Sequence, residues 1–221
     1  MKVKVIIPAS GSGERFGGRT PKQFLKIDGK EIIVLAIEKF HSIKLIDEII
    51  ISAQPEYFIK LLTLIKKNNF RKVKKIVEGG KTRQDSVYNA LLNLECEADD
   101  IVLVHDSVRP FISSKKINEL INETKKFKCV IPGMRMSETL KKVDGKNFVT
   151  ETIDRKNLWT VQTPQAFTVD ILKKSFDKAY KAGFTCTDES SVAENAGYKV
   201  RVIEGEKSNI KITVKEDLKR T

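Results

Sequence analysis

Residues 8–18, PASGSGERFGG, form the first arrangement in this sequence that could do chemistry. The segment holds four glycines and directly follows the apolar run 3–7. A glycine-rich loop at the end of a strand lets backbone N–H groups approach a phosphate closely. The loop lacks the Gly-Lys-Ser/Thr ending of a P-loop, and Phe16 stands where the GxGxxG dinucleotide pattern needs its third glycine. The segment therefore favours phosphate binding and argues against hydride transfer.

Two cations frame this loop, Arg15 within it and Lys22 beyond it. A single arginine or lysine is most often a solvated surface charge. Two of them beside a glycine loop at a strand end favour contacts with the anionic oxygens of a triphosphate.

Three later segments also place glycine, cationic or acidic residues after apolar runs: 78–86 (EGGKTRQDS), 105–110 (HDSVRP) and 209–213 (NIKIT). Ligands of open parallel sheets bind outside the carboxyl ends of the strands, where such loops meet. Asp106 is interpreted either as a Mg²⁺ ligand or as a helix N-cap, and the neighbouring phosphate loops favour the metal. His105 points to the opposite face of its strand and is expected to be a hydrogen-bonded core residue.

Strand-like and helix-like segments alternate along most of the chain. The strands are continuously apolar, which is typical of a mainly parallel sheet covered on both faces. The sequence thus predicts a three-layer α/β domain of Rossmann-like type. The expected strands are 3–7, 46–53, 73–77, 101–104, 129–131, 198–203 and 210–213. The expected helices are 30–43, one opening at Pro55, 83–94, 117–127, 168–183, one capped by Thr187, and a last one with Thr213 and Glu216 as a capping box.

The alternation breaks near residue 135. Segments 137–143 and 148–153 flank an Asp-Gly turn signal at 144–147, which predicts a protruding β-hairpin. Its exposed Thr and Val side chains are expected to pack on a second subunit. We interpret residues 1–221 as a single domain with a dimerisation arm at about 136–157.

The chain carries a net charge of +12, from 41 Lys and Arg against 29 Asp and Glu. Most lysines stand in pairs on predicted helix faces, which favours a solvated surface, with anionic small substrates or nucleic acid as alternatives. The longest apolar runs have about six residues, and the N-terminus has no signal-peptide pattern, so no membrane contact and a cytoplasmic location are expected. The cysteines have neither metal-ligand nor disulfide-framework spacing and are expected as small buried residues: Cys96, Cys129 and Cys186.

Residues 9–17 together with 21–25 resemble the signature of the sugar-nucleotide-type cytidylyltransferases. With further motifs, the chain resembles the 2-C-methyl-D-erythritol 4-phosphate cytidylyltransferase family of non-mevalonate isoprenoid synthesis, from residue 3 to about 218. These motifs are GGKTRQDSV (79–87), HDSVRPF (105–111), LWTVQTPQ (158–165), TDES (187–190) and NIKIT (209–213).

Two segments depart from the family pattern, one at Ser10 and one at residues 107–108. Ser10 stands where the family has Ala or Gly, and its small side chain is expected to preserve the loop. Ser107 and Val108 replace a common Ala-Ala pair, as in the ribitol 5-phosphate cytidylyltransferases of teichoic acid synthesis, so that acceptor remains an alternative. Segments 151–159 and 187–191 favour the methylerythritol enzymes.

The resemblance implies that the acceptor phosphate attacks the α-phosphorus of CTP and that pyrophosphate leaves, with Mg²⁺ held by Asp106. It implies a homodimer in which Arg155 and Thr163 reach across from the partner's arm. Its implied catalytic residues are Arg15, Lys22, Lys211 and Arg155. The implied nucleotide-binding residues are Pro8, Ala9, Ser10, Gly11, Ser12, Gly13, Lys22, Gly80, Arg83, Ser86 and Asp106. The implied acceptor-binding residues are Asp106, Arg109, Thr139, Arg155, Thr163 and Lys211.

Overall fold

The computed structural model describes residues 1–11 and 20–219 of the chain. Its central strands come from the continuous apolar runs and are buried on both faces, as parallel strands between helices must be. These strands are β1 (Val3–Pro8), β4 (Glu48–Ala53) and β6 (Ile101–Val104). Strand β1 pairs in parallel with both of its neighbours, so their carboxyl ends meet at one edge of the sheet.

In the described chain, the main sheet has eight strands in the order β10-β7-β11-β6-β1-β4-β5, with β12 paired to β7. The remaining strands are β5 (Val73–Glu78), β7 (Cys129–Arg135), β10 (Trp159–Val161), β11 (Gln165–Thr168) and β12 (Arg201–Glu204). Strand β11 runs antiparallel to both of its neighbours, β6 and β7, and β10 runs antiparallel to β7. The other pairings along the sheet are parallel. The prediction of a mainly parallel sheet is confirmed.

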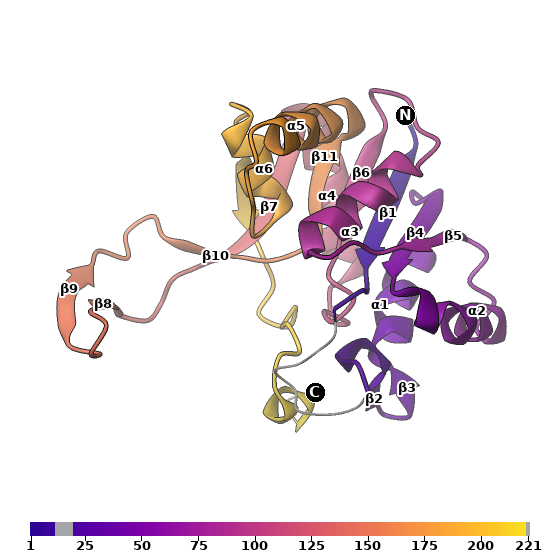
Figure 1. Ribbon diagram of the computed structural model, residues 1–221, viewed down its shortest axis with the longest axis horizontal. Helices are drawn as coiled ribbons and strands as arrows, with labels where there is room; N and C mark the ends of the chain where they lie inside the picture. Colours follow the sequence, from indigo (N-terminus) through magenta and orange to yellow (C-terminus); the bar gives the residue numbers. More distant parts are fainter. Residues whose placement is uncertain (12–19, 220–221) are drawn as a thin grey trace.

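Helices cover both faces of this sheet and complete the three layers (Figure 1). One face is covered by α1 (Ile32–His41), α2 (Phe58–Lys67) and α4 (Ser114–Phe127), and the other by α3 (Arg83–Leu92), α5 (Val169–Lys181) and α6 (Glu189–Asn195). Side chains alternate along β1, so Val5 and Ile7 pack in the first core cluster and Ile6 packs in the second. The two cores fix the sheet edge on which the loops converge.

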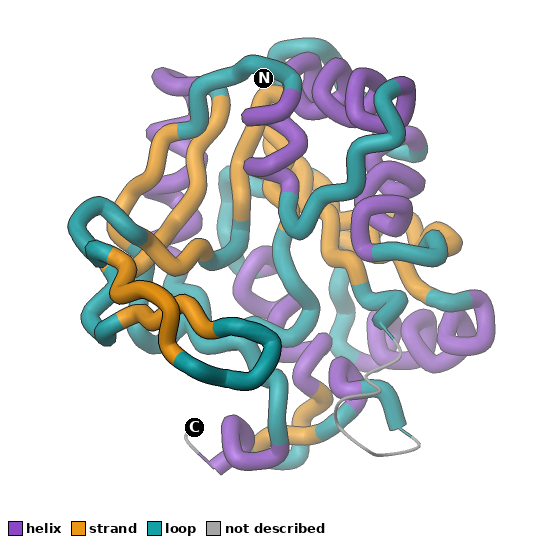
Figure 2. The backbone as a smooth tube through the Cα atoms, turned by 60° about the vertical axis from the view of Figure 1, so that its left-hand side comes forward, coloured by secondary structure: helices purple, strands orange, loops and turns teal. Residues whose placement is uncertain are grey.

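The predicted hairpin is present as β8 (Leu140–Val143) and β9 (Val149–Ile153), and it projects beyond the body of the molecule (Figures 1 and 2). Its turn is fixed by Asp144, whose Oδ1 accepts hydrogen bonds from the backbone N–H groups of Lys146 and Phe148 at 2.8 and 3.0 Å. Asn147 adopts a φ of 65°, a conformation that asparagine tolerates better than most residues. We call residues 136–157 the arm.

Several expected element boundaries differ from the structure, among them the start of α4 at Ser114 and the start of β12 at Arg201. The helix expected from Lys30 begins at Ile32, because Lys30–Glu31 forms strand β3 and pairs with β2 (Lys26–Ile27). A short 3-10 helix, Pro55–Tyr57, precedes α2. Asp188 caps α6 instead of Thr187, since its carboxylate accepts from the backbone N–H of Ser191 at 3.1 Å.

The strand expected at 210–213 is not formed. Ile212 donates one backbone hydrogen bond to Val108 and packs with Ile27 and Ile32, away from the sheet. The last turn is the 3-10 helix Lys215–Lys219, and Asp217, not Glu216, accepts from the backbone N–H of Thr213 at 2.7 Å. In the described chain no helix has the length and apolar character that a bilayer crossing requires.

Candidate active site

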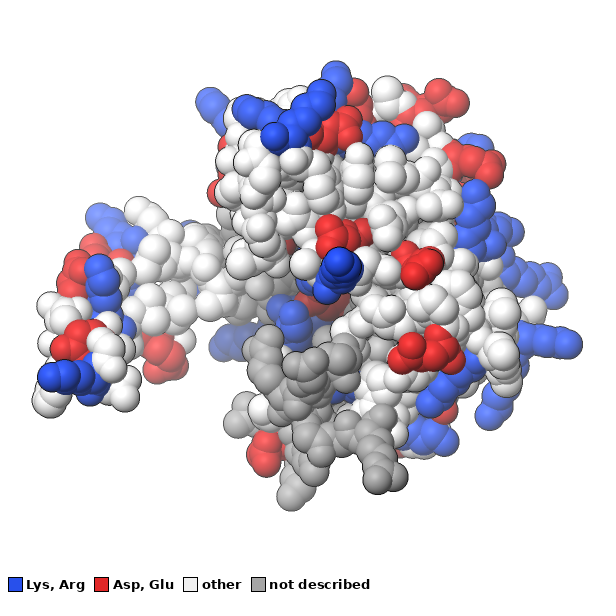
Figure 3. Space-filling view, viewed as in Figure 1, with Lys and Arg blue, Asp and Glu red and all other residues white. Residues whose placement is uncertain are grey.

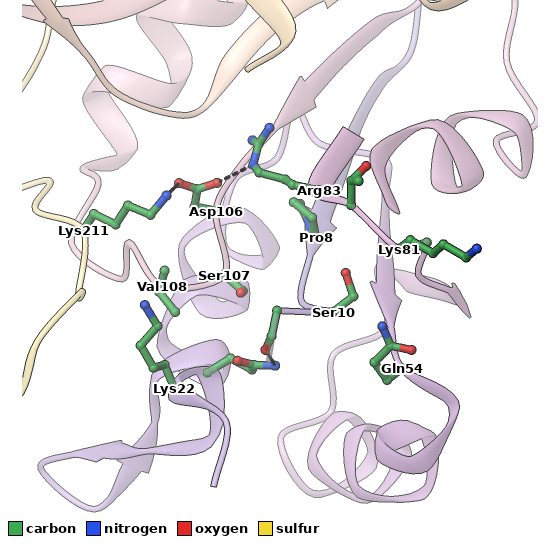
Figure 4. Close-up of a pocket in the computed structure, with 14 residues that line it drawn as sticks. Pro8, Ser10, Lys22, Gln54, Lys81, Arg83, Asp106, Ser107, Val108 and Lys211 are labelled. Atoms are coloured by element: carbon green, nitrogen blue, oxygen red, sulfur yellow. Dashed lines mark hydrogen bonds and ion pairs between the residues drawn. The ribbon is translucent and has the colours of Figure 1, made fainter. Parts of the chain in front are cut away.

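A cavity of about 480 Å³ opens at the carboxyl ends of β1, β5 and β6 (Figure 4). It gathers loops that are distant in sequence, as the parallel topology requires. Predicted site residues that line it are Pro8, Ser10, Gly11, Lys22, Gly80, Arg83, Asp106 and Lys211. Residues not predicted to bind ligand also line it: Gln23, Gln54, Lys81, Thr82, Ser107 and Val108.

Asp106 is the centre of charge in this cavity. Its Oδ1 accepts a hydrogen bond from Arg83 Nε at 3.1 Å, and its Oδ2 lies 2.9 Å from Lys211 Nζ and 3.6 Å from Arg109 Nε (Figure 4). Burial alone would raise the pKa of Asp106, but Arg83, Lys211 and Arg109 together hold it well below its ordinary value. The carboxylate is therefore ionised at neutral pH and holds together cations from three separate loops.

Glu189, at the first turn of α6, was not predicted as a site residue. Its fully buried carboxylate accepts two hydrogen bonds from Arg83, at 2.7 and 3.0 Å. Burial raises the pKa of Glu189, and the Arg83 guanidinium opposes that rise. Burial also opposes the charge on Arg83, but Glu189 and Asp106 raise the arginine's pKa above its ordinary value. Arg83 is thus held in one orientation by carboxylates on two sides, a role that the TDES motif alone did not reveal.

Thr163 lies in the core of the same chain, beneath Asp106. Its hydroxyl accepts from the backbone N–H of Asp106 at 3.1 Å and lies 3.1 Å from Nδ1 of His105. Because Nε2 of His105 faces the carbonyl of Arg109 at 2.9 Å, Nε2 carries the proton and Nδ1 accepts from Thr163. Burial lowers the pKa of His105 to about 4, which keeps the ring neutral. The core reading of His105 is confirmed, and the expectation that Thr163 reaches across from a partner's arm is wrong.

Two glycines allow the loop after β5 to close against its neighbours. A Cβ on Gly79 would lie 2.5 Å from Cβ of Ser10, and one on Gly80 would lie 2.1 Å from Cβ of Asp85. Ser86 is fully buried, so it does not line the cavity but fixes Gly80 by accepting its N–H at 3.1 Å. Glycine is required at position 79 by the close approach of the first loop and at position 80 by the close approach of the first turn of α3.

Gln23 shapes the first loop, although the sequence interpretation gave it no role. Its buried amide donates to the carbonyl of Ala9 at 2.6 Å. Ala9 itself is buried and contributes its backbone to the loop, not a cavity-lining side chain. The signal for this role was the position of Gln23 in the PKQ segment beside Lys22.

The remaining predicted residues do not join the cavity in a single chain. Thr139 and Arg155 are exposed on the arm, where Arg155 donates to the backbone carbonyl of Ser137. Arg109 is oriented by Asp106 and by the carbonyl of Asn209, to which its Nη1 donates at 2.9 Å. Ser12, Gly13 and Arg15 lie outside the described residues.

The surface charge is distributed over several elements. On the face shown in Figure 3, Lys and Arg side chains lie around the periphery of the body and on the arm, with acidic side chains among them. Several of the described lysines pair with carboxylates one helical turn away, such as Lys174 with Asp170 at 2.9 Å. Many Lys and Arg side chains therefore lie on the surface outside the cavity, some of them paired with carboxylates.

A mainly parallel sheet with glycine loops and a cation-clamped carboxylate at its strand ends defines a nucleotidyltransferase-type α/β protein. The chain belongs to the 2-C-methyl-D-erythritol 4-phosphate cytidylyltransferase family, whose model matches residues 3–221.

Named relatives agree with this assignment. The enzyme of that name from Clostridioides difficile is 44% identical over 97% of this chain and 90% of its own length. The crystal structure of the enzyme of that name from Francisella tularensis superposes with a TM-score of 0.83 at 37% identity, covering 100% of this chain and 98% of that one. The 4-diphosphocytidyl-2C-methyl-D-erythritol synthase structure from Anaerococcus prevotii gives a TM-score of 0.86 at 30% identity, over 99% and 93% of the two chains. These comparisons support the methylerythritol interpretation and not the ribitol alternative.

Proposed function

We propose that this protein transfers CMP from CTP to 2-C-methyl-D-erythritol 4-phosphate, giving 4-diphosphocytidyl-2-C-methyl-D-erythritol and pyrophosphate. The observation that carries the proposal is Asp106 with Arg83, Arg109 and Lys211 at the end of a glycine-loop cavity, in a chain of this family. This arrangement concentrates positive charge where two anionic substrates must meet.

The reaction is a displacement at phosphorus. An oxygen of the acceptor phosphate forms a new bond to the α-phosphorus of CTP, while the bond from that phosphorus to the β-phosphate oxygen breaks and pyrophosphate leaves. Phosphate is already a nucleophile near neutral pH, so no general base is needed. Alignment and charge repulsion dominate the barrier, and fixed cations address both.

The cations divide this work by position. Lys22 lines the cavity beside the first glycine loop and is assigned to the phosphates of CTP and the leaving pyrophosphate, together with Arg15. Lys211 lies 2.9 Å from Asp106 and is assigned to the junction of the nucleotide and acceptor phosphates. Arg109, held beside the same carboxylate, is assigned to the acceptor.

The neutral part of the cavity is assigned to the nucleoside. Gly80 and the first-loop residues Pro8, Ser10 and Gly11 line it, and Ser86 holds Gly80 from behind. Arg83 lines the wall between this part and Asp106.

Asp106 is also the candidate Mg²⁺ ligand. Among the described residues no group of three His, Cys, Asp or Glu side chains could hold a metal. A single carboxylate still fits Mg²⁺, because this ion takes its other ligands from substrate phosphates and water. When bound beside Asp106, the ion would supply positive charge to the triphosphate.

The protein is assigned as a cytoplasmic homodimer, and the arm is assigned as the contact between its two subunits. Thr139 and Arg155 carry hydroxyl and guanidinium groups suited to a polyol phosphate, but in one chain they stand on the arm and do not line the cavity. Exposed apolar side chains on the arm, Val143, Phe148 and Val149, support contact with a second copy. In such a dimer each arm would complete the acceptor site of the other subunit.

Pyrophosphate release is the measurement that tests the proposal. With CTP and Mg²⁺, methylerythritol phosphate should support rapid release and ribitol 5-phosphate little or none. A preference for ribitol phosphate would overturn the acceptor assignment. CTP binding with no release for either acceptor would indicate a nucleotide-binding regulator instead of an enzyme.

A further inference from the structure

The hydroxyls of Ser10 and Ser86 form a contact of 2.6 Å between the first glycine loop and the start of α3. Ser86 has two other partners: its Oγ lies 2.8 Å from the carbonyl of Thr82 and 3.1 Å from the N–H of Gly80. The positions of the two hydroxyl protons follow from these distances.

Two oxygens this close repel each other unless a proton lies between them. A carbonyl has no proton to give, so Ser86 must donate its only proton to Thr82. The contact between the serines then needs the proton of Ser10. This is the one arrangement that places a proton in both short oxygen contacts, and it makes Ser10 the donor and Ser86 the acceptor.

Ser10 is therefore left with acceptor lone pairs and no proton for a ligand. It lines the cavity, and none of the hydrogen bonds described for it besides that with Ser86 engages its hydroxyl. Its side chain is confined by Gly79, where a Cβ would come within 2.5 Å of Cβ and 2.9 Å of Oγ of Ser10. Rotation that would turn the proton toward a ligand leaves the short contact with Ser86 without a proton.

The position of Ser10 indicates which part of a nucleotide it faces. Lys22, Asp106 and Lys211 lie on one side of the cavity, and Ser10 and Gln54 lie on the other (Figure 4). Lys81 is nearest to the Ser10 side, but Figure 4 shows its ammonium group pointing away from the cavity. A triphosphate is drawn to the cationic side, which leaves the neutral, hydrogen-bonding side to the base.

We propose that Ser10 is a specificity residue that accepts a hydrogen bond from the exocyclic amine of the cytosine base. This inference rests on the proposed function, because it takes CTP as the nucleotide. Uracil carries a carbonyl oxygen where cytosine carries the amine, so it would meet a lone pair at Ser10. A site built to pair with a donor rejects the analogue that lacks it, because a buried polar group is then unpaired.

The test compares kcat/KM for CTP and UTP in the full-length enzyme and in Ser10→Ala. We expect the CTP/UTP ratio to fall roughly ten-fold, the cost of one unmade hydrogen bond, through loss of CTP activity. The KM for the acceptor should stay unchanged.

Ser52→Ala is the matched control. Ser52 is a buried serine that pairs with Pro8 across β1 and β4, and its hydroxyl has no hydrogen-bond partner in the described chain. This variant also removes one buried hydroxyl beside the first loop, and it should leave the CTP/UTP ratio unchanged.

Ser86→Ala provides a second, independent readout. Without Ser86 as acceptor, the proton of Ser10 is free to turn toward a carbonyl, so UTP should be used better relative to CTP. In a Ser10→Ala background, Ser86→Ala should not change the ratio further, because the group that it frees is absent. Additive effects on the ratio would contradict the shared network.

The remaining outcomes also decide the matter. An unchanged ratio in Ser10→Ala with an active wild type would limit Ser10 to packing. Equal losses with CTP and UTP but none with dCTP would place the hydrogen bond at the ribose and overturn the amine assignment. If the wild type releases no pyrophosphate from CTP, the proposed function fails by itself, and that result is distinct from failure of the Ser10 proposal.

Discussion

The cavity and the arm differ in how completely one chain builds them. At the cavity, loops from separate strands converge, and Asp106 ties three of them together through Arg83, Arg109 and Lys211. On the arm, Thr139 and Arg155 belong to the same expected acceptor set but stand exposed on a two-stranded hairpin. The cavity is organised by intrachain packing, whereas the arm carries functional groups whose partners must come from elsewhere. Changes in the two regions should therefore fail in different ways.

Lys211→Ala should have the largest effect and would mark the cavity as the chemical centre. Lys211 is half-exposed and in contact with Asp106, so its loss should leave the fold intact. It should lower kcat by about 10²–10³, the usual cost of one group that stabilises transition-state charge. Stopped-flow pyrophosphate release measures this. Lys81→Ala, at the cavity rim, is the control, and equal losses in both variants would contradict the assignment.

The pH dependence of stability at His105 provides a test of whether the cavity wall is part of the folding core. Burial lowers its pKa to about 4 from an ordinary 6.5, so the unfolded chain binds a proton that the folded protein does not. The neutral, buried ring therefore contributes ~3 kcal/mol to the free energy of unfolding. This contribution is complete above pH 6.5 and is lost as the pH falls toward 4. Urea unfolding at a series of pH values should show this loss, and His105→Gln should flatten it.

A direct titration keeps that prediction testable if His105→Gln folds poorly. The chain has two histidines, so their imidazole signals can be separated by NMR. The signal of His105 should not titrate above about pH 5, given the burial that depresses its pKa. Titration near 6.5 would show that the ring is accessible and that the wall opens.

Arg155→Ala asks whether the arm completes a partner's site. Alone, it should raise KM for the acceptor about ten- to a hundred-fold, the effect of losing a charged hydrogen bond, with little change for CTP. Mixing it with Lys22→Ala subunits should restore activity, because each mixed dimer would contain one intact site. Random pairing of equal amounts should give up to about a quarter of wild-type activity. No recovery would mean that Arg155 acts within its own chain or not at all.

The residues that line the cavity could be predicted from the sequence better than the residues that hold them in place. Apolar strand runs fix where the strands end, and the parallel topology then brings the motif loops together. Glu189 escaped prediction because an acidic residue at a helix start has an ordinary capping explanation, and only the fold places it against Arg83. Thr163 was misassigned to the arm because nothing in its motif indicates that the chain has already re-entered the sheet.

The predictions for the irregular parts of the sheet were incomplete for a similar reason. Segment 210–213 has the composition of a strand, but Ile212 finds a separate apolar cluster with Ile27 and Ile32. Strands β10 and β11 contain only three and four residues, which is too short for the alternation of apolar and polar residues to identify a strand. Their antiparallel pairing is set by the tertiary context of β7.

Phe148→Ser should have the smallest effect on the folded chain and would sharpen the contrast between the two regions. Its side chain is 69% exposed at the tip of the arm, so the free energy of unfolding should change by no more than about 0.5 kcal/mol. If the arm packs on a second copy, the same change should raise the dimer dissociation constant, measured by analytical ultracentrifugation. Thr150→Ser, on the neighbouring strand, should alter neither quantity. A dimer that Phe148→Ser does not weaken would move the subunit contact away from the tip, and loss of chain stability would mean that the arm is part of the folding core.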